Sequence, residues 1–163
     1  MSAANFITDR VTERWAELYD RAFPQVYRAL VAATLDRERA LDGLHDAFEE
    51  GLRNPPADGR NLEGWLYRVA LRKTRRSLFR MLRERPMPEI SSEDPTLALL
   101  QRLEVGRLLV LLTERQRSIV VAHYYLGLTQ EEIAEALGVR RGTVSATVSQ
   151  ALARMREGGA KRV

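Results

Sequence analysis

Residues 128–156, LTQEEIAEALGVRRGTVSATVSQALARMR, restrict the fold of this chain more than any other stretch. Apolar residues recur three and four positions apart on both sides of Gly138, which predicts two amphipathic helices. Gly138 can adopt the left-handed conformation that ends a helix, so the connecting turn is short. The residues expected to pack the two helices together are Ile133, Ala134, Leu137, Val144, Val148, Leu152 and Met155. This is the helix-turn-helix pattern, in which the second helix enters the major groove of DNA.

The outward face of the second helix carries small and hydrogen-bonding side chains. A side chain such as Gln150 suits adenine, Ala146 suits a thymine methyl group, and an arginine suits guanine or phosphate. The candidate DNA-contacting residues are Arg140, Arg141, Thr143, Ser145, Ala146, Thr147, Ser149 and Gln150. An ordinary helical hairpin with a small polar face is the alternative interpretation.

Helical spacing continues through the rest of the chain, and no run alternates with the period of two that a strand needs. We therefore predict an all-α fold. Pro24 favours a kink or a break in the first helix, which should begin near Thr8, and Asp36 should cap the second. Proline, glycine and polar residues predict a loop at 54–61 and a linker after it. The expected organisation is a small helical domain at 1–85, a linker at 86–95 and a second helical domain at 96–163, with helices at 95–112, 114–126, 129–137 and 142–157.

The helix expected to begin near Leu62 has an apolar face and a basic face. The apolar face carries Leu62, Trp65, Leu66, Val69 and Ala70, and the basic side carries Arg68, Arg72, Lys73, Arg75, Arg76 and Arg80. Like charges four residues apart destabilise a helix by about 0.2–0.5 kcal/mol per pair, so we expect an external polyanion to offset the repulsion. A solvated charged face and an anionic membrane surface are the alternatives.

Charge is segregated along the chain. It is −3 over 1–56, +6 over 57–85, −2 over 86–112 and +3 over 113–163, which sums to the formal +4. Two basic segments separated by an acidic one indicate two surfaces that meet one extended polyanion.

Several classes of chemistry have no support in the composition. Cysteine is absent and histidine occurs only at His45 and His123, so disulfides, thiol chemistry and a Cys/His zinc site are excluded. The sequence has no Ser/His or Cys/His set for nucleophilic catalysis, no phosphate-binding glycine loop and no metal-binding cluster. We therefore expect that the protein is not an enzyme and binds no cofactor or metal. The N-terminus has no leader pattern and the longest apolar run is short, so we expect a soluble cytoplasmic protein that does not enter a membrane.

Three stretches together resemble a bacterial RNA polymerase sigma factor of the extracytoplasmic-function (ECF) group, which has only sigma domains two and four. LDGLHDAFEEGLR resembles the second-helix motif of domain two, and GWLYRVALRKTRRSLFR resembles its third helix. The helix-turn-helix stretch resembles that of domain four. The resemblance covers nearly the whole chain. It implies a protein that directs core polymerase to promoters and helps to melt them, without catalytic residues.

The resemblance also implies partners. The second helix would dock on the clamp helices of the β′ subunit through Asp42, Leu44, His45, Asp46, Phe48 and Glu49, although Leu44 and Phe48 also fit the core of the bundle. Domain four would rest on the β flap and bind the duplex minus-thirty-five element. The third helix and the loop before it, with Asn61, would hold the melted minus-ten strand, and Trp65 either stacks on an unpaired base or packs in the core. An anti-sigma factor would sequester the protein.

Several positions depart from the family pattern. The family commonly has Asn and Asp where Arg72 and Arg76 stand, and Gln-Glu in place of His45 and Asp46. It usually has Lys-Ser-Arg or Lys-Ser-Gln at 145–147. The promoter sequence preference of the family is therefore not assigned to this chain. Two other classes stay open: a stand-alone helix-turn-helix regulator that binds duplex DNA as a dimer, and a sigma-like adaptor that binds polymerase without recognising promoters.

Overall fold

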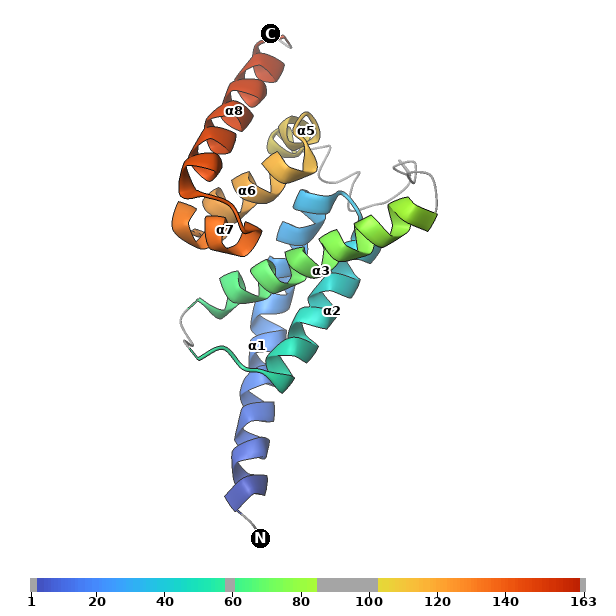
Figure 1. Ribbon diagram of the computed structural model, residues 1–163, viewed down its shortest axis with the longest axis vertical. Helices are drawn as coiled ribbons and strands as arrows, with labels where there is room; N and C mark the ends of the chain where they lie inside the picture. Colours follow the sequence, from blue (N-terminus) through green and yellow to red (C-terminus); the bar gives the residue numbers. More distant parts are fainter. Residues whose placement is uncertain (1–2, 58–60, 85–102, 162–163) are drawn as a thin grey trace.

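The computed structural model describes residues 3–57, 61–84 and 103–161, and within these ranges the regular structure is entirely helical. Figure 1 shows the arrangement of the helices. They are α1 (Ala3–Thr34), α2 (Arg37–Arg53), α3 (Leu62–Glu84), α5 (Glu104–Val110), α6 (Glu114–Tyr124), α7 (Gln130–Leu137) and α8 (Arg141–Ala160). The all-α prediction is confirmed. No helix in the described ranges has the length and apolar character needed to cross a membrane.

Helices α1, α2 and α3 pack side by side around a buried core (Figure 1). Asp36 caps α2 as predicted, because its side chain accepts a hydrogen bond from the backbone N–H of Arg39 at 3.0 Å. The close packing of α1 on α2 depends on Gly51, where a Cβ would lie 2.3 Å from Cη2 of Trp15. The indole of Trp15 in turn contacts the rings of Phe48 and Trp65. Glycine at this position therefore makes room for an aromatic cluster.

Helix α1 differs from the prediction at its start and in its continuity. The helix begins earlier than expected, and it runs through Pro24 without a break. Pro24 is exposed, so the pyrrolidine ring faces solvent instead of a neighbouring helix. Tyr19 is 37% exposed at the edge between α1 and α2, where its ring centroid lies 4.8 Å from that of Phe48.

The C-terminal helices form around α6 and α7, whose first turns are each fixed by a capping box. Thr113 with Gln116 and Thr129 with Glu132 each make both reciprocal side-chain to backbone hydrogen bonds. Gly138 ends α7 with a φ of 64°, in the left-handed region that favours glycine. Of the helix expected at 95–112, the structure describes Glu104–Val110, and the part of it before residue 103 lies outside the described residues.

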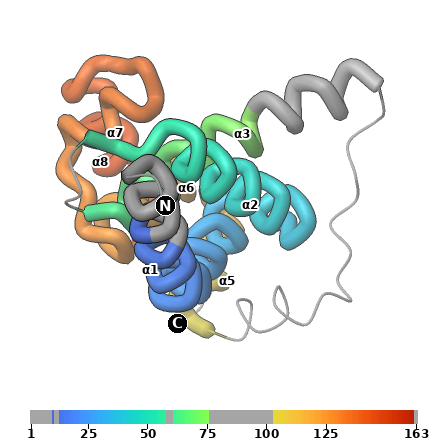
Figure 2. The backbone as a smooth tube through the Cα atoms, turned by 90° about the horizontal axis from the view of Figure 1, so that it is seen from below, coloured from blue at the N-terminus to red at the C-terminus, as the bar shows by residue number. Residues whose placement is uncertain are grey.

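The two groups of helices pack against each other. Helix α6 lies on α1, and both α6 and α7 contact α3, so the buried residues form one continuous core. Figures 1 and 2 both place α7 beside the N-terminal half of α3. The linker prediction at 86–95 falls outside the described residues.

Candidate nucleic-acid interface

Helix α8 has the two faces that its sequence predicts. Val144, Val148 and Ala151 are buried against the rest of the C-terminal domain. The opposite face is open to solvent and carries Gly142, Thr143, Ser145, Ala146, Ser149 and Gln150. Because these side chains are short, a DNA groove can approach the helix closely while Gln150 keeps both a donor and an acceptor for a base edge.

Thr147 is a correction to the predicted interface. Its side chain is largely buried, and its hydroxyl donates a hydrogen bond to the carbonyl of Thr143 at 2.7 Å. A threonine in a helix commonly makes this bond to the residue four positions earlier. Thr147 therefore supports the helix and does not face DNA in this conformation.

Two arginines stand at the start of α8. Arg140 is the exposed N-cap residue, and the exposed Arg141 pairs through Nε with Oε1 of Glu131 in α7 at 2.8 Å. The N-terminus of a helix carries a partial positive charge and free N–H groups, which favour an anion. The two guanidinium groups add positive charge at this end of α8, where that of Arg141 is paired with Glu131.

The basic side of α3 divides into parts with different surroundings. Arg72 is exposed, whereas Lys73 and Arg75 are half-buried. Lys73 lies 3.6 Å from Oε2 of Glu50 in α2, and the pKa of Glu50 is lowered by a hydrogen bond from Asn54 and by the charge of Lys73. The side chains of Arg76 and Arg80 lie outside those that the structure describes.

Arg68 lies nearer to the C-terminal domain than the other basic residues of α3. It is half-buried, and its Nε is fully buried without a hydrogen-bond partner among the described atoms. A small cavity beside it is lined by Leu71 of α3 and by Ala136 and Leu137 of α7. The C-terminal domain therefore covers part of the predicted basic face.

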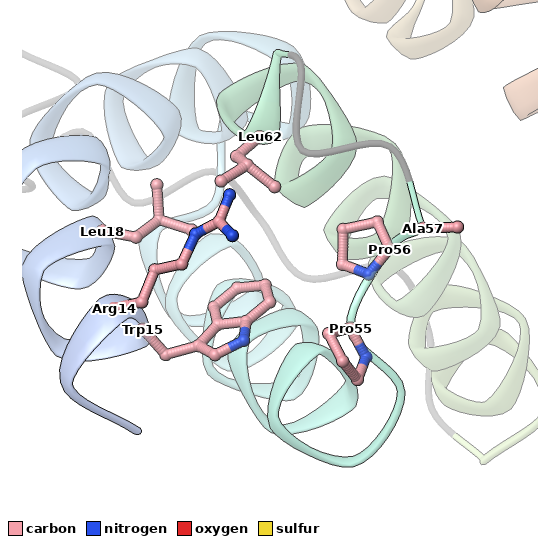
Figure 3. A pocket seen from close by; sticks show the side chains of 7 residues that line it. All are labelled: Arg14, Trp15, Leu18, Pro55, Pro56, Ala57 and Leu62. Carbon is pink, nitrogen blue, oxygen red and sulfur yellow. The ribbon is translucent and has the colours of Figure 1, made fainter. Parts of the chain in front are cut away.

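The loop before α3 borders a pocket of about 120 Å³. Figure 3 shows its lining, with Arg14, Trp15 and Leu18 from α1, Pro55, Pro56 and Ala57 from the loop, and Leu62 at the start of α3. The wall is mainly apolar, and Arg14 adds a guanidinium beside Leu62 (Figure 3). Sequence analysis did not identify this pocket, because Arg14 and Pro55 are far apart along the chain.

Asn61 and Trp65 have structural roles next to this pocket. Asn61 has a φ of 48°, and its Oδ1 accepts a hydrogen bond from the backbone N–H of Gly64 at 3.0 Å, which caps α3. Trp65 is half-buried, and its ring centroid lies 5.9 Å from that of Trp15. Of the two roles considered for Trp65, packing in the core is the one that the structure describes.

The predicted polymerase-binding set on α2 separates into exposed and buried residues. Asp42, His45, Asp46 and Glu49 are exposed and share one helix face. Leu44 and Phe48 are a correction, because they are 0% and 7% exposed and belong to the core. The exposed face continues at Leu52, which is 50% exposed, and borders the aromatic rings of Tyr19 and Phe23 on α1.

Comparison with protein families and curated proteins agrees with the motifs. Residues 102–155 match the family model described as Sigma-70, region 4. The RNA polymerase sigma-E factor of Streptomyces avermitilis is 37% identical over 105 residues, which cover 62% of this chain and 59% of that protein. The ECF RNA polymerase sigma factor SigL of Mycobacterium tuberculosis is 27% identical over 150 residues, which cover 85% of each. The chain therefore spans about three fifths of the length of the sigma-E relatives that it matches.

Two solved structures share the fold. RpoE of Bartonella quintana, solved with the anti-sigma factor NepR, superposes with a TM-score of 0.69 over 89% of this chain and 96% of that chain, at 17% identity. CnrH, solved with the cytosolic domain of CnrY, gives a TM-score of 0.67 over 98% of this chain and 96% of that one, at 19% identity. These findings confirm the resemblance to ECF sigma factors, and residues 102–155 are similar to sigma-70 region 4.

Proposed function

We propose that this chain is an ECF-type sigma factor that binds core RNA polymerase, recognises a promoter and helps to open it. The observation that carries the proposal is the pairing, in one chain, of a region 4 helix-turn-helix with a second helical domain that presents a basic helix face. The protein acts by binding, and the chemistry of RNA synthesis belongs to the polymerase. Its place of action is the cytoplasm, where the polymerase is.

In this proposal the C-terminal domain, 96–163, binds duplex DNA at the minus-thirty-five element. Helix α8 lies in the major groove with Thr143, Ala146 and Gln150 toward the base edges, while Arg140 and Arg141 contact phosphate or guanine. The same domain rests on the β flap of the polymerase. Support for a protein contact comes from α5, where the apolar side chains of Val105 and Val110 are 61% and 43% exposed.

The N-terminal domain, 1–85, holds the melted minus-ten strand in the same proposal. The basic face of α3 would follow the phosphates, and the release of their counterions would make binding depend steeply on salt. The pocket at the 54–61 loop supports a contact with an unstacked base, because Trp15 and the two prolines give it apolar walls beside the guanidinium of Arg14. Duplex recognition and strand capture are thus assigned to separate domains.

The exposed face of α2 docks on the clamp helices of the β′ subunit. Its acidic residues Asp42, Asp46 and Glu49, with His45 between them, are solvent-facing and so available to a partner. The two structural neighbours were each solved with a protein partner, NepR and CnrY, and the first is named as an anti-sigma factor. This supports an anti-sigma factor as a further partner of this chain.

Run-off transcription with core polymerase on genomic fragments tests the proposal. A sigma factor produces initiation at new sites that depends on this chain. A stand-alone regulator would bind duplex DNA without polymerase and would not cause core polymerase to initiate transcription. An adaptor would bind core polymerase, but transcription would not start at new sites. Either of these two outcomes would overturn the proposed function.

A further inference from the structure

We propose that Glu131 is a positioning residue, which orients Arg141 to recognise a guanine and so sets the sequence preference of the helix-turn-helix at one base pair. This role rests on the proposed function, in which α8 lies in the major groove. It assigns Arg141 to a base edge, whereas the proposed function allows either guanine or phosphate.

An ion pair joins the two helices of the helix-turn-helix, α7 and α8, which pack against each other (Figure 1). Oε1 of Glu131 in the first turn of α7 lies 2.8 Å from Nε of Arg141, the first residue of α8. The side chains of Glu131 and Arg141 are 62% and 68% exposed, so the pair adds little to folding stability. What the pair determines is the position of the guanidinium, on a side chain that stays open to a ligand.

Two adjacent glutamates in the first turn of α7 have different partners. Oε2 of Glu132 accepts a hydrogen bond from the backbone N–H of Thr129 at 2.8 Å, which completes the capping box. Glu131 comes one residue earlier, so its side chain leaves the helix about 100° away from that of Glu132. The partial positive charge at the start of α7 favours a carboxylate at this position. Glu131 is therefore not needed to cap α7, and its carboxylate reaches α8 instead.

The paired guanidinium suits a guanine better than a phosphate. Glu131 contacts Nε, which lies at the base of the planar fork, whereas the two Nη groups lie at its tip. Guanine presents O6 and N7 side by side, and an arginine binds both only in a fixed orientation. A phosphate contact depends mainly on net positive charge, which the carboxylate of Glu131 offsets. A guanidinium that is held in place and partly neutralised is therefore better adapted to a base edge than to the backbone.

The surroundings of Arg141 leave room for a base pair. Gly142 follows it in α8, and a Cβ built there would meet no atom within 4 Å. Thr143 and Ala146 are exposed and short, so they do not hold the groove away from the helix. In a helix-turn-helix, the N-terminal residues of the second helix are the ones that contact base edges. Arg141 is thus both oriented by Glu131 and placed where a base edge is within reach.

Enrichment from a random-sequence duplex DNA library tests this role. The full chain, with and without core polymerase, is bound to the library, and the bound DNA is sequenced. The wild-type chain should enrich guanine at one position, and Arg141→Ala should lose that preference. Glu131→Gln should lower the guanine preference at the same position about tenfold and leave the other positions unchanged. Glu135→Gln is the matched control, because it removes an exposed carboxylate from the same helix.

A double variant separates positioning from a general effect of charge or folding. Because Glu131 acts through Arg141, the double variant with Glu131→Gln and Arg141→Ala should have the same base preferences as Arg141→Ala alone. A change in overall charge would instead alter binding to all sequences, and Glu135→Gln would reproduce it. The melting temperature of Glu131→Gln, followed by circular dichroism, should equal that of Glu135→Gln, because the ion pair is exposed.

Two results would overturn the role of Glu131. One is a guanine preference that Glu131→Gln retains at the wild-type level, and the other is the absence of any guanine preference that depends on Arg141, both with and without core polymerase. Run-off transcription by the same proteins separates these results from a failure of the proposed function. A chain that shows the expected loss of guanine preference but never initiates transcription with core polymerase would contradict the proposed function and support the role of Glu131.

Discussion

Replacement of Arg117 by methionine should lower the free energy of unfolding by about 2–4 kcal/mol. Arg117 is 8% exposed at the junction of the two domains. Its Nε donates to the carbonyl of Ala33, and its Nη1 donates to the carbonyl of Leu112 at 2.6 Å. Ala33 lies in the last turn of α1, where carbonyls have no partner within the helix. The guanidinium therefore also acts as a cap for α1.

The magnitude follows from two opposing effects. A hydrogen bond to a charged donor contributes about 1.5–3 kcal/mol, so the loss of two would cost roughly 3–6 kcal/mol. Burial of the guanidinium lowers the pKa of Arg117, which shows that desolvation disfavours its charged form, and methionine recovers that cost. Methionine has similar length and leaves little cavity, but it leaves two carbonyls without a donor. The loss outweighs the gain because both carbonyls stay buried in the folded state.

Urea denaturation of wild type, Arg117→Met and Arg115→Met provides the assay. Arg115 is exposed on the same helix, so its replacement should change the free energy of unfolding by less than about 0.5 kcal/mol. A loss in Arg117→Met no larger than that of the Arg115 control would refute the reasoning. It would show that the cross-domain bonds of Arg117 contribute nothing in solution.

Three further predictions concern packing, pH and DNA. Gly51→Ala should lower the free energy of unfolding by about 1–3 kcal/mol, because the new Cβ would lie 2.3 Å from the indole of Trp15; thermal melting checks it. Burial raises the pKa of Tyr67, so the tyrosine ionises first in the unfolded chain. The free energy of unfolding should therefore fall as pH rises above about 10. Tyr67→Phe should remove that decline, as measured by urea denaturation at several pH values. Gln150→Ala should weaken discrimination at one base pair by about 1–3 kcal/mol. Arg140→Ala should instead weaken binding to all sequences and reduce the slope of the logarithm of the binding constant against the logarithm of salt concentration by about 0.9. Promoter binding by the holoenzyme measures both effects.

Local features of the fold could be predicted because neighbouring residues determine them. The capping boxes that begin with Thr113 and Thr129 use groups three residues apart, and Gly138 ends α7 without help from other elements. The buried positions of α8 follow from helical spacing alone. In each case the sequence already contains both interacting groups within one turn.

The candidate site was less predictable, because helical spacing shows which face of a helix is apolar but not which element packs against that face. Leu44 and Phe48 share α2 with the exposed acidic face and fit either role by sequence, and the packing of α1 and α3 on α2 shows that they are buried. The contacts of Arg39 with Glu114 and of Arg117 with Ala33 join residues 75 and 84 positions apart. No local pattern marks these residues, because their chemistry depends on how the two domains meet.

The most direct test of the central claim compares strand opening with polymerase binding in the same samples. Holoenzyme containing the Arg72→Ala, Arg75→Ala double variant should bind core polymerase with wild-type affinity but show little promoter melting by permanganate footprinting. Charge reversal at Asp46 and Glu49 on α2 should instead weaken binding to core polymerase. Promoter melting by the double variant at the wild-type level would contradict the account, because the α3 face would then have no part in holding the open strand.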